Sequence, residues 1–168
     1  ADPSPQTAFH LIEMEGVTTS ALVPPLAQAW VASAEKRGVS LPSLQTLQVG
    51  GSKLAPAVAG KIESVLGCTV QQVFGMAEGL VNYTRSTDMI ELRLRTQGYP
   101  ISPDDEILIV DDQDQPVKRG ESGHLLTRGP YTIRGYYLEE NANRYGFTED
   151  GFYRTGDIVR LVAGKYLE

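Results

Sequence analysis

Helix and strand patterns alternate through residues 6–74, and this alternation is the feature that most limits how the chain can fold. Apolar spacing predicts helices at 6–15, 24–37 and 56–66, and strands at 18–23, 44–49 and 69–74. Pro24-Pro25 supply first-turn prolines for the second helix, while Gly38 and Gly67 end the second and third. Strands separated by helices need crossover connections, so the expected arrangement is a parallel sheet.

From about Ser86 the pattern changes to short strands at 106–111 and 124–128, with polar turn residues between them and a short helix near 139–145. Such spacing is typical of a small antiparallel sheet or barrel. The expected fold class is therefore α/β. Part of a parallel α/β subdomain occupies residues 1–90, and a small antiparallel β-barrel-like subdomain occupies residues 91–168. The junction is expected between Thr84 and Gly98.

Composition excludes several classes of protein. The net charge is −6, with 15 Lys+Arg and 21 Asp+Glu and no basic stripe, so nucleic acid is not an expected partner. No apolar run is long enough for a membrane span, and the first residues do not have the pattern of a signal peptide. The one cysteine, Cys68, favours a reducing, cytoplasmic location and is expected to be a small buried hydrophobe.

Two of the predicted strands end in glycine-bearing loops. Gly50, Gly51 and Ser52 follow the strand at 44–49, and the stretch 75–79 follows the strand at 69–74. In open α/β sheets, ligands bind outside the carboxyl ends of the strands. Glycines let a flat ligand approach bare backbone, so the slot would suit a planar ring such as adenine. The alternative for the glycine pair is ordinary turn chemistry.

Two carboxylates stand out against this background. Glu78 leaves the second glycine loop, where it would hold Mg²⁺, which takes one or two carboxylates together with phosphate oxygens. The alternative is a strand-to-helix turn with Glu78 at a helix start. Asp157 follows Gly156 at an expected strand entrance, where it would accept hydrogen bonds from a ribose diol. The alternative is an aspartate that caps a turn.

Other catalytic signatures are missing from the sequence. No GxxxxGK(S/T) loop, no Ser–His–Asp order with an elbow motif and no zinc-ligand spacing occurs. His10 and His124 are expected to be structural. Trp30 and the pair Tyr136-Tyr137 are expected to be aromatics of the core or of a contact between domains.

Five stretches together resemble the adenylate-forming superfamily of acyl- and aryl-activating ligases: VGGSKL, QQVFGMAEGLVNYTR, TQGYPIS, TRGPYTIRGYY and GFYRTGD. FGMAEG stands where the superfamily carries a YGxTE-type motif, and YRTGD is a further signature of it. The extended QQVFGMAEGLVNYTR is most similar to the aryl acid-AMP ligases of siderophore biosynthesis, which activate 2,3-dihydroxybenzoate or salicylate. The resemblance covers essentially the whole chain.

The resemblance implies a role for each matching residue. Glu78 would bind Mg²⁺ and so contribute to catalysis, and Asp157 would hold the ribose hydroxyls of ATP. The adenine and the neighbouring acyl site would be bordered by Gly51, Ser52, Phe74, Gly75, Met76 and Ala77. The aryl pocket would be lined by Gly50, Gly51, Ser52, Val73 and Val81. Many relatives of the dihydroxybenzoate type have alanine at the position of Ser52, which leaves the aryl acid undefined.

The implied reaction activates an aryl acid with Mg·ATP to an aryl-adenylate, which then passes to the phosphopantetheine thiol of an aryl carrier protein in nonribosomal peptide synthesis. The phosphate loop, an aryl-pocket asparagine and the C-terminal lysine domain of the family do not occur in these residues. We therefore expect a middle segment of the large N-terminal domain of such an enzyme, inactive by itself. Two alternatives stay open: an aryl-CoA ligase, and a non-catalytic module that binds nucleotide or a partner.

Overall fold

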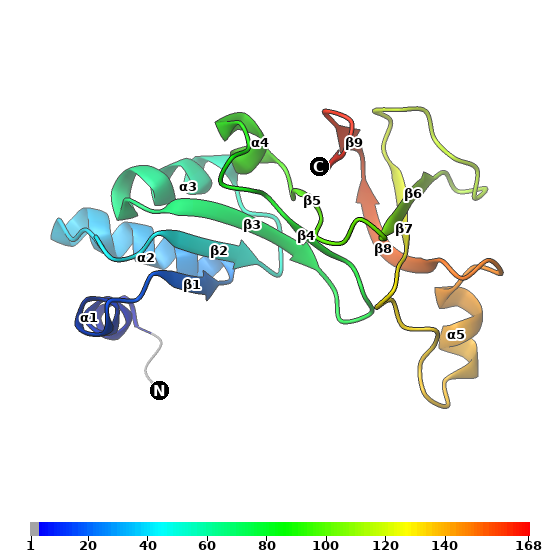
Figure 1. The fold of residues 1–168 in the computed structure, drawn as a ribbon, viewed down its shortest axis with the longest axis horizontal. Helices are drawn as coiled ribbons and strands as arrows, with labels where there is room; N and C mark the ends of the chain where they lie inside the picture. Colours follow the sequence, from blue (N-terminus) through cyan, green and yellow to red (C-terminus); the bar gives the residue numbers. More distant parts are fainter. Residues whose placement is uncertain (1–3) are drawn as a thin grey trace. The chain divides into compact units, whose positions relative to one another are not determined.

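The computed structural model describes residues 4–168, and the chain divides into two compact units (Figure 1). The first unit holds the residues up to Phe74 together with Thr84–Gln97, and the second holds Gly75–Tyr83 with Gly98–Glu168. The segment Gly75–Tyr83, which carries the FGMAEG glutamate, thus clusters with the later part of the chain. The predicted boundary between two domains after residue 90 stays a prediction, because a compact unit defined by contacts need not coincide with a domain.

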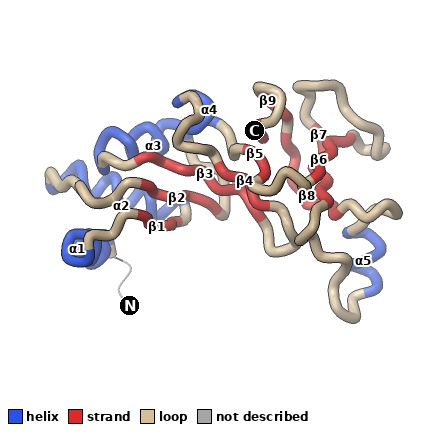
Figure 2. Tube along the Cα trace, viewed as in Figure 1, coloured by secondary structure: helices blue, strands red, loops and turns tan. Residues whose placement is uncertain are grey.

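Three parallel strands form the centre of the first unit. They are β1 (Thr19–Leu22), β2 (Thr46–Gly50) and β3 (Thr69–Gly75), and they alternate with the helices α1 (Pro5–Glu15), α2 (Pro24–Arg37) and α3 (Pro56–Lys61). Figure 2 shows the alternation of helix and strand along this part of the chain. The predicted order of elements and the parallel sheet are both confirmed.

One face of this sheet is buried against the helices. Leu47 and Val49 of β2 and Val70 of β3 point into a core that also contains Trp30 of α2 and Phe9 of α1. The rings of Phe9 and Trp30 meet edge to face with their centroids 5.3 Å apart, a favoured aromatic geometry. Because strand side chains alternate between the two faces, the intervening residues of β2 point toward the opposite face. Trp30 is a core residue, as predicted.

Helix ends follow the proline and glycine positions that the sequence marks. Pro24 and Pro56 lie in the first turns of α2 and α3, and Gly38 ends α2 in the left-handed conformation with φ of 63°. The third helix departs from the prediction, because its second half, Ile62–Leu66, is π-helical. There the Ser64 hydroxyl donates to the Gly60 carbonyl at 3.0 Å, a local bond of the kind that perturbs regular helix geometry.

Cys68 lies just before β3 and is only 3% exposed. Burial raises the pKa of its thiol to about 11, because an apolar environment disfavours the thiolate. This residue is a small buried hydrophobe, as predicted.

Three short elements between the two halves of the chain were not predicted from the sequence. These are β4 (Val81–Tyr83), α4 (Ile90–Arg95) and β5 (Tyr99–Pro100). In the second unit, β4 and β5 pair antiparallel, with Asn82 opposite Pro100. In the first unit, α4 is held by the Arg93 guanidinium, which lies 3.1 Å from the Glu63 carboxylate. Elements this short contain too few residues to show a repeating spacing of apolar side chains, so the sequence pattern does not reveal them.

The second unit is built mainly from antiparallel strands, as predicted. Its strands β6 (Glu106–Val110), β7 (Gly123–Arg128) and β8 (Tyr153–Val159) form a sheet in the order β6-β7-β8, and β9 (Leu161–Val162) pairs with β10 (Tyr166–Leu167). The short helix α5 (Glu140–Gly146) precedes β8, within a residue of its predicted bounds. Within residues 4–168 these pairings give one open sheet and one separate ladder.

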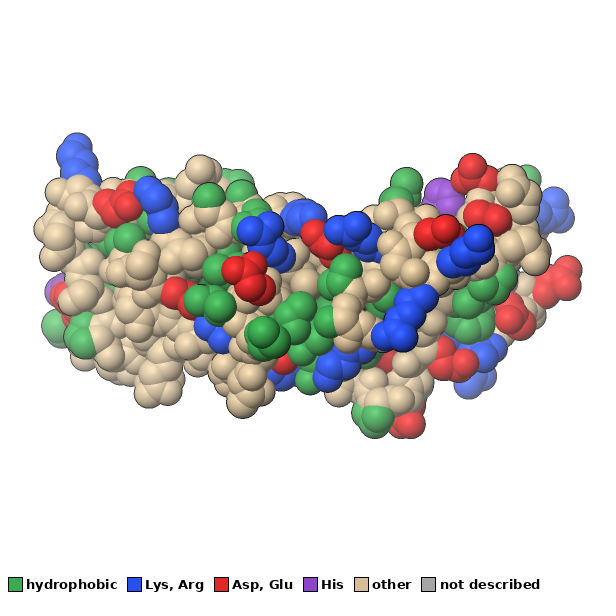
Figure 3. All heavy atoms as spheres, turned by 90° about the horizontal axis from the view of Figure 1, so that it is seen from above, with side chains coloured by type: hydrophobic (Ala, Val, Ile, Leu, Met, Phe, Trp, Pro, Cys, Tyr) green, Lys and Arg blue, Asp and Glu red, His purple; other side chains and the backbone are tan. Residues whose placement is uncertain are grey.

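On the face drawn in Figure 3, Lys and Arg side chains are interspersed with Asp and Glu side chains. Within the part of the chain that the structure describes, every helix is too short or too polar to cross a membrane.

Candidate functional site

The carboxyl ends of β2 and β3 bring bare backbone to one edge of the first unit. Gly50 lies opposite Val73 in the parallel register. A Cβ atom at Gly50 would lie 2.7 Å from the carbonyl oxygen of Val73, so no other residue fits there without a backbone shift. The two strand ends therefore lie side by side, as predicted, and glycine is required for their spacing.

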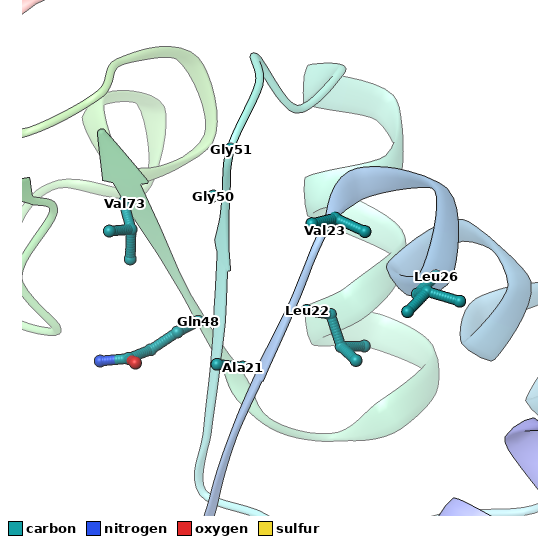
Figure 4. Close-up of a pocket in the computed structure, with 8 residues that line it drawn as sticks. All are labelled: Ala21, Leu22, Val23, Leu26, Gln48, Gly50, Gly51 and Val73. Atoms are coloured by element: carbon teal, nitrogen blue, oxygen red, sulfur yellow. The ribbon is translucent and has the colours of Figure 1, made fainter. Parts of the chain in front are cut away.

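A groove of about 490 Å³ opens at this edge. It is lined by Ala21, Leu22, Val23, Leu26, Gln48, Gly50, Gly51 and Val73. In Figure 4 the glycine pair lies between Val73 on one side and Val23 on the other. The walls are mainly apolar, which suits a flat hydrophobic ring.

Gln48 is the polar side chain of this groove, and sequence analysis did not identify it. Its amide nitrogen donates to Gln71 Oε1 at 2.8 Å, and the Gln71 amide in turn donates to the Thr84 carbonyl at 2.9 Å. The Gln48 side chain is thus held in place from β3. The signal was present in the sequence, because Gln48 is two residues from Gly50 and therefore lies on the same face of the strand.

The structure brings together three of the five residues predicted for an aryl pocket. Gly50, Gly51 and Val73 line the groove, whereas Ser52 follows directly in the chain but does not line it. Val81 lies on β4, in the second unit. Of the residues predicted to border adenine, Phe74 is the last of the β3 residues in the first unit, whereas Gly75, Met76 and Ala77 belong to the second.

Glu78 lies in a tight turn that connects two strands. The Met76 amide donates to the Leu80 carbonyl at 3.0 Å, and the Gly79 amide donates to the Met76 carbonyl at 3.2 Å. The turn leads from β3 into β4. The alternative expectation, with Glu78 at the start of a helix, is therefore wrong, because three residues of strand and no helical turn follow it.

This turn is docked on a later segment of the second unit. The amide of Ile133 donates to the carbonyl of Glu78 at 2.8 Å. Gly79 has φ of 131°, and a Cβ atom there would lie 2.3 Å from the Cα atom of Thr132. The second glycine of FGMAEG is thus required for close approach of two backbones, and that approach fixes where Glu78 leaves the turn.

The carboxylate of Glu78 meets Tyr136, whose hydroxyl also contacts Tyr153. Tyr136 Oη donates to Glu78 Oε1 at 2.9 Å, and the hydroxyls of Tyr136 and Tyr153 are 3.1 Å apart. The hydrogen bond with Tyr153, followed by the hydrogen bond to Glu78, raises the pKa of Tyr136 well above its usual value. Glu78 is half-buried, so the cluster is partly shielded from solvent.

The expectation that the pair Tyr136-Tyr137 lies in a core is wrong for Tyr137, and the alternative of a contact between domains stays a prediction. Tyr137 is 89% exposed and belongs to no core, whereas Tyr136 is bound to the predicted metal ligand. Adjacent residues after Gly135 have opposite environments because the chain turns there. Nothing in the sequence pointed to the contact, since Tyr136 follows Glu78 by 58 positions.

The donor set around Glu78 fits a magnesium ion shared with a phosphate ligand. Within residues 4–168 no cluster of three or more His, Cys, Asp or Glu side chains could cage a metal unaided. Mg²⁺ commonly takes one or two carboxylates and completes its shell with water and substrate phosphates. Glu78 Oε1 already accepts from Tyr136, so Oε2 is the oxygen that would meet the ion.

Asp157 lies inside β8, where the strand is irregular. His124 pairs with Ile158 and Leu126 pairs with Arg154, so Thr155–Asp157 face a single residue of β7. Gly156 has φ of 81° at this bulge, and the Asp157 amide donates to Thr155 Oγ1 at 3.1 Å. The expectation that Asp157 lies at the start of a strand is therefore wrong. The Asp157 side chain is presented by a β-bulge, a device that re-aims side chains near functional sites.

A family model described as AMP-binding enzyme matches residues 1–137. The chain belongs to the AMP-binding enzyme family. Its predicted membership of the adenylate-forming superfamily is thus confirmed. A 2,3-dihydroxybenzoate-AMP ligase of Bacillus subtilis is 61% identical over 98% of the chain, and the chain spans 31% of that protein. A Streptomyces protein named salicylyl-CoA synthase / salicylate adenylyltransferase is 56% identical over 95% of the chain, which spans 29% of it.

A solved structure agrees with these relatives. The apo structure of MbtA from Mycobacterium smegmatis superimposes with a TM-score of 0.92 at 50% identity, covering 99% of this chain and 31% of that one. The predicted likeness to the aryl acid-AMP ligases is confirmed. The chain spans about a third of the length of the relatives it matches.

Gly79→Ala should lower the free energy of unfolding by roughly 3 kcal/mol or more, because the new Cβ meets backbone atoms that cannot rotate away. Gly151→Ala is the matched control, since Gly151 also has a positive φ, 86°, but no heavy atom within 4 Å. Its cost is expected to be about 1–2 kcal/mol. Urea unfolding of both variants measures the difference, and equal losses would contradict the docking of the turn.

Proposed function

We propose that these residues are a segment of an aryl acid-AMP ligase, which activates 2,3-dihydroxybenzoate or salicylate with Mg·ATP for siderophore biosynthesis in the cytoplasm. The observation that carries the proposal is the apolar groove at the carboxyl ends of β2 and β3. Its glycine-lined edge would accept a flat ring, and its apolar walls suit the aromatic ring of an aryl acid better than a polar aliphatic chain. The names of the relatives support the same class of substrate.

The reaction joins an oxygen of the aryl carboxylate to the α-phosphorus of ATP, and the bond from that phosphorus to the bridging oxygen of pyrophosphate breaks. Two anions must approach each other, so catalysis depends on charge neutralisation and positioning. Bound Mg²⁺ would supply positive charge to the phosphates. In this chain Glu78 would hold that ion, and Asp157 would accept hydrogen bonds from the ribose hydroxyls.

The groove would bind the aryl acid, and the glycine loops would border the adenine. Gly50, Gly51 and Val73 would contact the aryl ring, and Ser52 and Val81 would complete its surroundings. The adenine would be bordered by Phe74, Gly75, Met76 and Ala77 together with the glycine loop. The family resemblance places the cationic groups of adenylation outside these residues, so we expect no adenylation by the 168 residues alone.

Glu78→Ala in the full-length protein should slow ATP–pyrophosphate exchange about 10- to 1000-fold, the scale of one lost electrostatic contact at a reacting centre. The control is Glu13→Ala, which removes an exposed carboxylate on α1 in the first unit. It should leave exchange unchanged. Near-wild-type exchange by Glu78→Ala would remove Glu78 from the site.

The thiol acceptor separates this proposal from its runner-up. We expect an aryl carrier protein to receive the acyl group on its phosphopantetheine thiol. The relative whose name includes a CoA synthase favours coenzyme A instead. Incubation of the full-length protein with salicylate or 2,3-dihydroxybenzoate, Mg·ATP and either acceptor should give thioester on the carrier protein only. Thioester on coenzyme A alone would establish an aryl-CoA ligase.

A further inference from the structure

A chain of two tyrosine hydroxyls ends on the carboxylate of Glu78. Each hydroxyl has one proton to donate. Tyr136 donates its proton to Glu78 Oε1 at 2.9 Å. The contact of 3.1 Å between the two hydroxyls is then made by the proton of Tyr153. The direction of the chain is therefore fixed, from Tyr153 through Tyr136 to Glu78.

Tyr136 is held at both its backbone and its ring. The side-chain oxygen of Asn143, on α5, accepts from the Tyr136 amide at 2.6 Å, and the Asn143 amide nitrogen donates to the Tyr136 carbonyl at 2.9 Å. Phe147 packs against both tyrosine rings, with its ring centroid 6.2 Å from that of Tyr136 and 5.3 Å from that of Tyr153. A hydroxyl supported in this way has little freedom to leave its partner.

The side-chain donor at the Glu78 carboxylate, Tyr136, is a neutral group. No ion pair of Glu78 occurs in the described part of the chain. A lysine or arginine at the position of Tyr136 would cancel the charge that attracts a cation. A phenol hydroxyl orients the carboxylate and leaves its negative charge in place.

We propose that Tyr136 and Tyr153 are positioning residues that fix the Glu78 carboxylate for metal binding. Tyr136 occupies Oε1 and Tyr153 orients Tyr136, so that Oε2 is left for Mg²⁺. This inference rests on the proposed function. It also links the predicted metal contact of Glu78 with the predicted ribose contact of Asp157, because β8 carries both Tyr153 and Asp157.

The test uses the full-length protein with Tyr136→Phe, Tyr153→Phe and the double variant. Phenylalanine keeps the ring and its contacts, so only the hydroxyls are removed. Tyr137→Phe is the matched control, because Tyr137 is the next residue and is 89% exposed. Two quantities are measured: Mn²⁺ binding in the presence of a non-hydrolysable ATP analogue, by electron paramagnetic resonance, and the Mg²⁺ dependence of ATP–pyrophosphate exchange.

Tyr136→Phe should weaken Mn²⁺ binding about 10- to 100-fold, the usual effect of losing a hydrogen bond to a metal ligand, and raise the half-saturating Mg²⁺ concentration in parallel. The KM for the aryl acid and the Tm should match those of Tyr137→Phe. Tyr153→Phe should have a smaller effect of the same kind. The double variant should have the same Mn²⁺ affinity as Tyr136→Phe, because Tyr153 acts through Tyr136.

Two results would overturn the inference. The first is a metal affinity of Tyr136→Phe that matches that of the control. The second is a fall in metal affinity accompanied by a rise in the KM for the aryl acid and a fall in Tm, which indicates a merely structural role. Glu78→Ala distinguishes this failure from that of the proposed function. If Glu78→Ala abolishes Mn²⁺ binding and Tyr136→Phe does not weaken it, only the tyrosine chain is wrong. If Glu78→Ala binds Mn²⁺ normally, the metal role itself is wrong.

Discussion

The contact between the backbones of Gly79 and Thr132 is the constraint on which the second unit's site depends. It docks the turn that carries Glu78 on the segment that carries Tyr136, and only glycine permits an approach this close. The hydrogen bond from Ile133 to the Glu78 carbonyl sets the register of that docking. The lone carboxylate of FGMAEG is thereby held where the Tyr136 hydroxyl reaches it. The close approach of the two backbones is the structural reason for the glycine in the turn.

A second glycine constraint shapes the first unit. Parallel pairing places Gly50 against Val73, and the missing side chain lets the two strand ends lie edge to edge beneath an apolar groove. Both units therefore use glycine for close backbone approach, at a strand end in the first unit and in a turn between strands in the second. In the first unit the result is the edge of an apolar groove, and in the second it is a fixed position for the Glu78 side chain.

Local signals in the sequence were sufficient for most of the fold. Proline and glycine marked the ends of α2, and apolar alternation located β2 and β3, because those patterns depend on neighbours within a few residues. Contacts between distant residues were not accessible in the same way. Tyr136 meets Glu78 across 58 positions, and the bulge at Asp157 depends on pairing with β7. The predicted roles of the site residues came from motif resemblance, and they stay predictions.

The most direct measurement of the central claim is a crystal structure of the full-length protein with Mn²⁺ and a non-hydrolysable ATP analogue. We expect an anomalous Mn²⁺ peak coordinated by Glu78 Oε2, with Tyr136 still bonded to Oε1 and the ribose hydroxyls bonded to Asp157. A nucleotide that contacts neither carboxylate, with Glu78 and Asp157 on opposite faces and no ligand between them, would contradict the account.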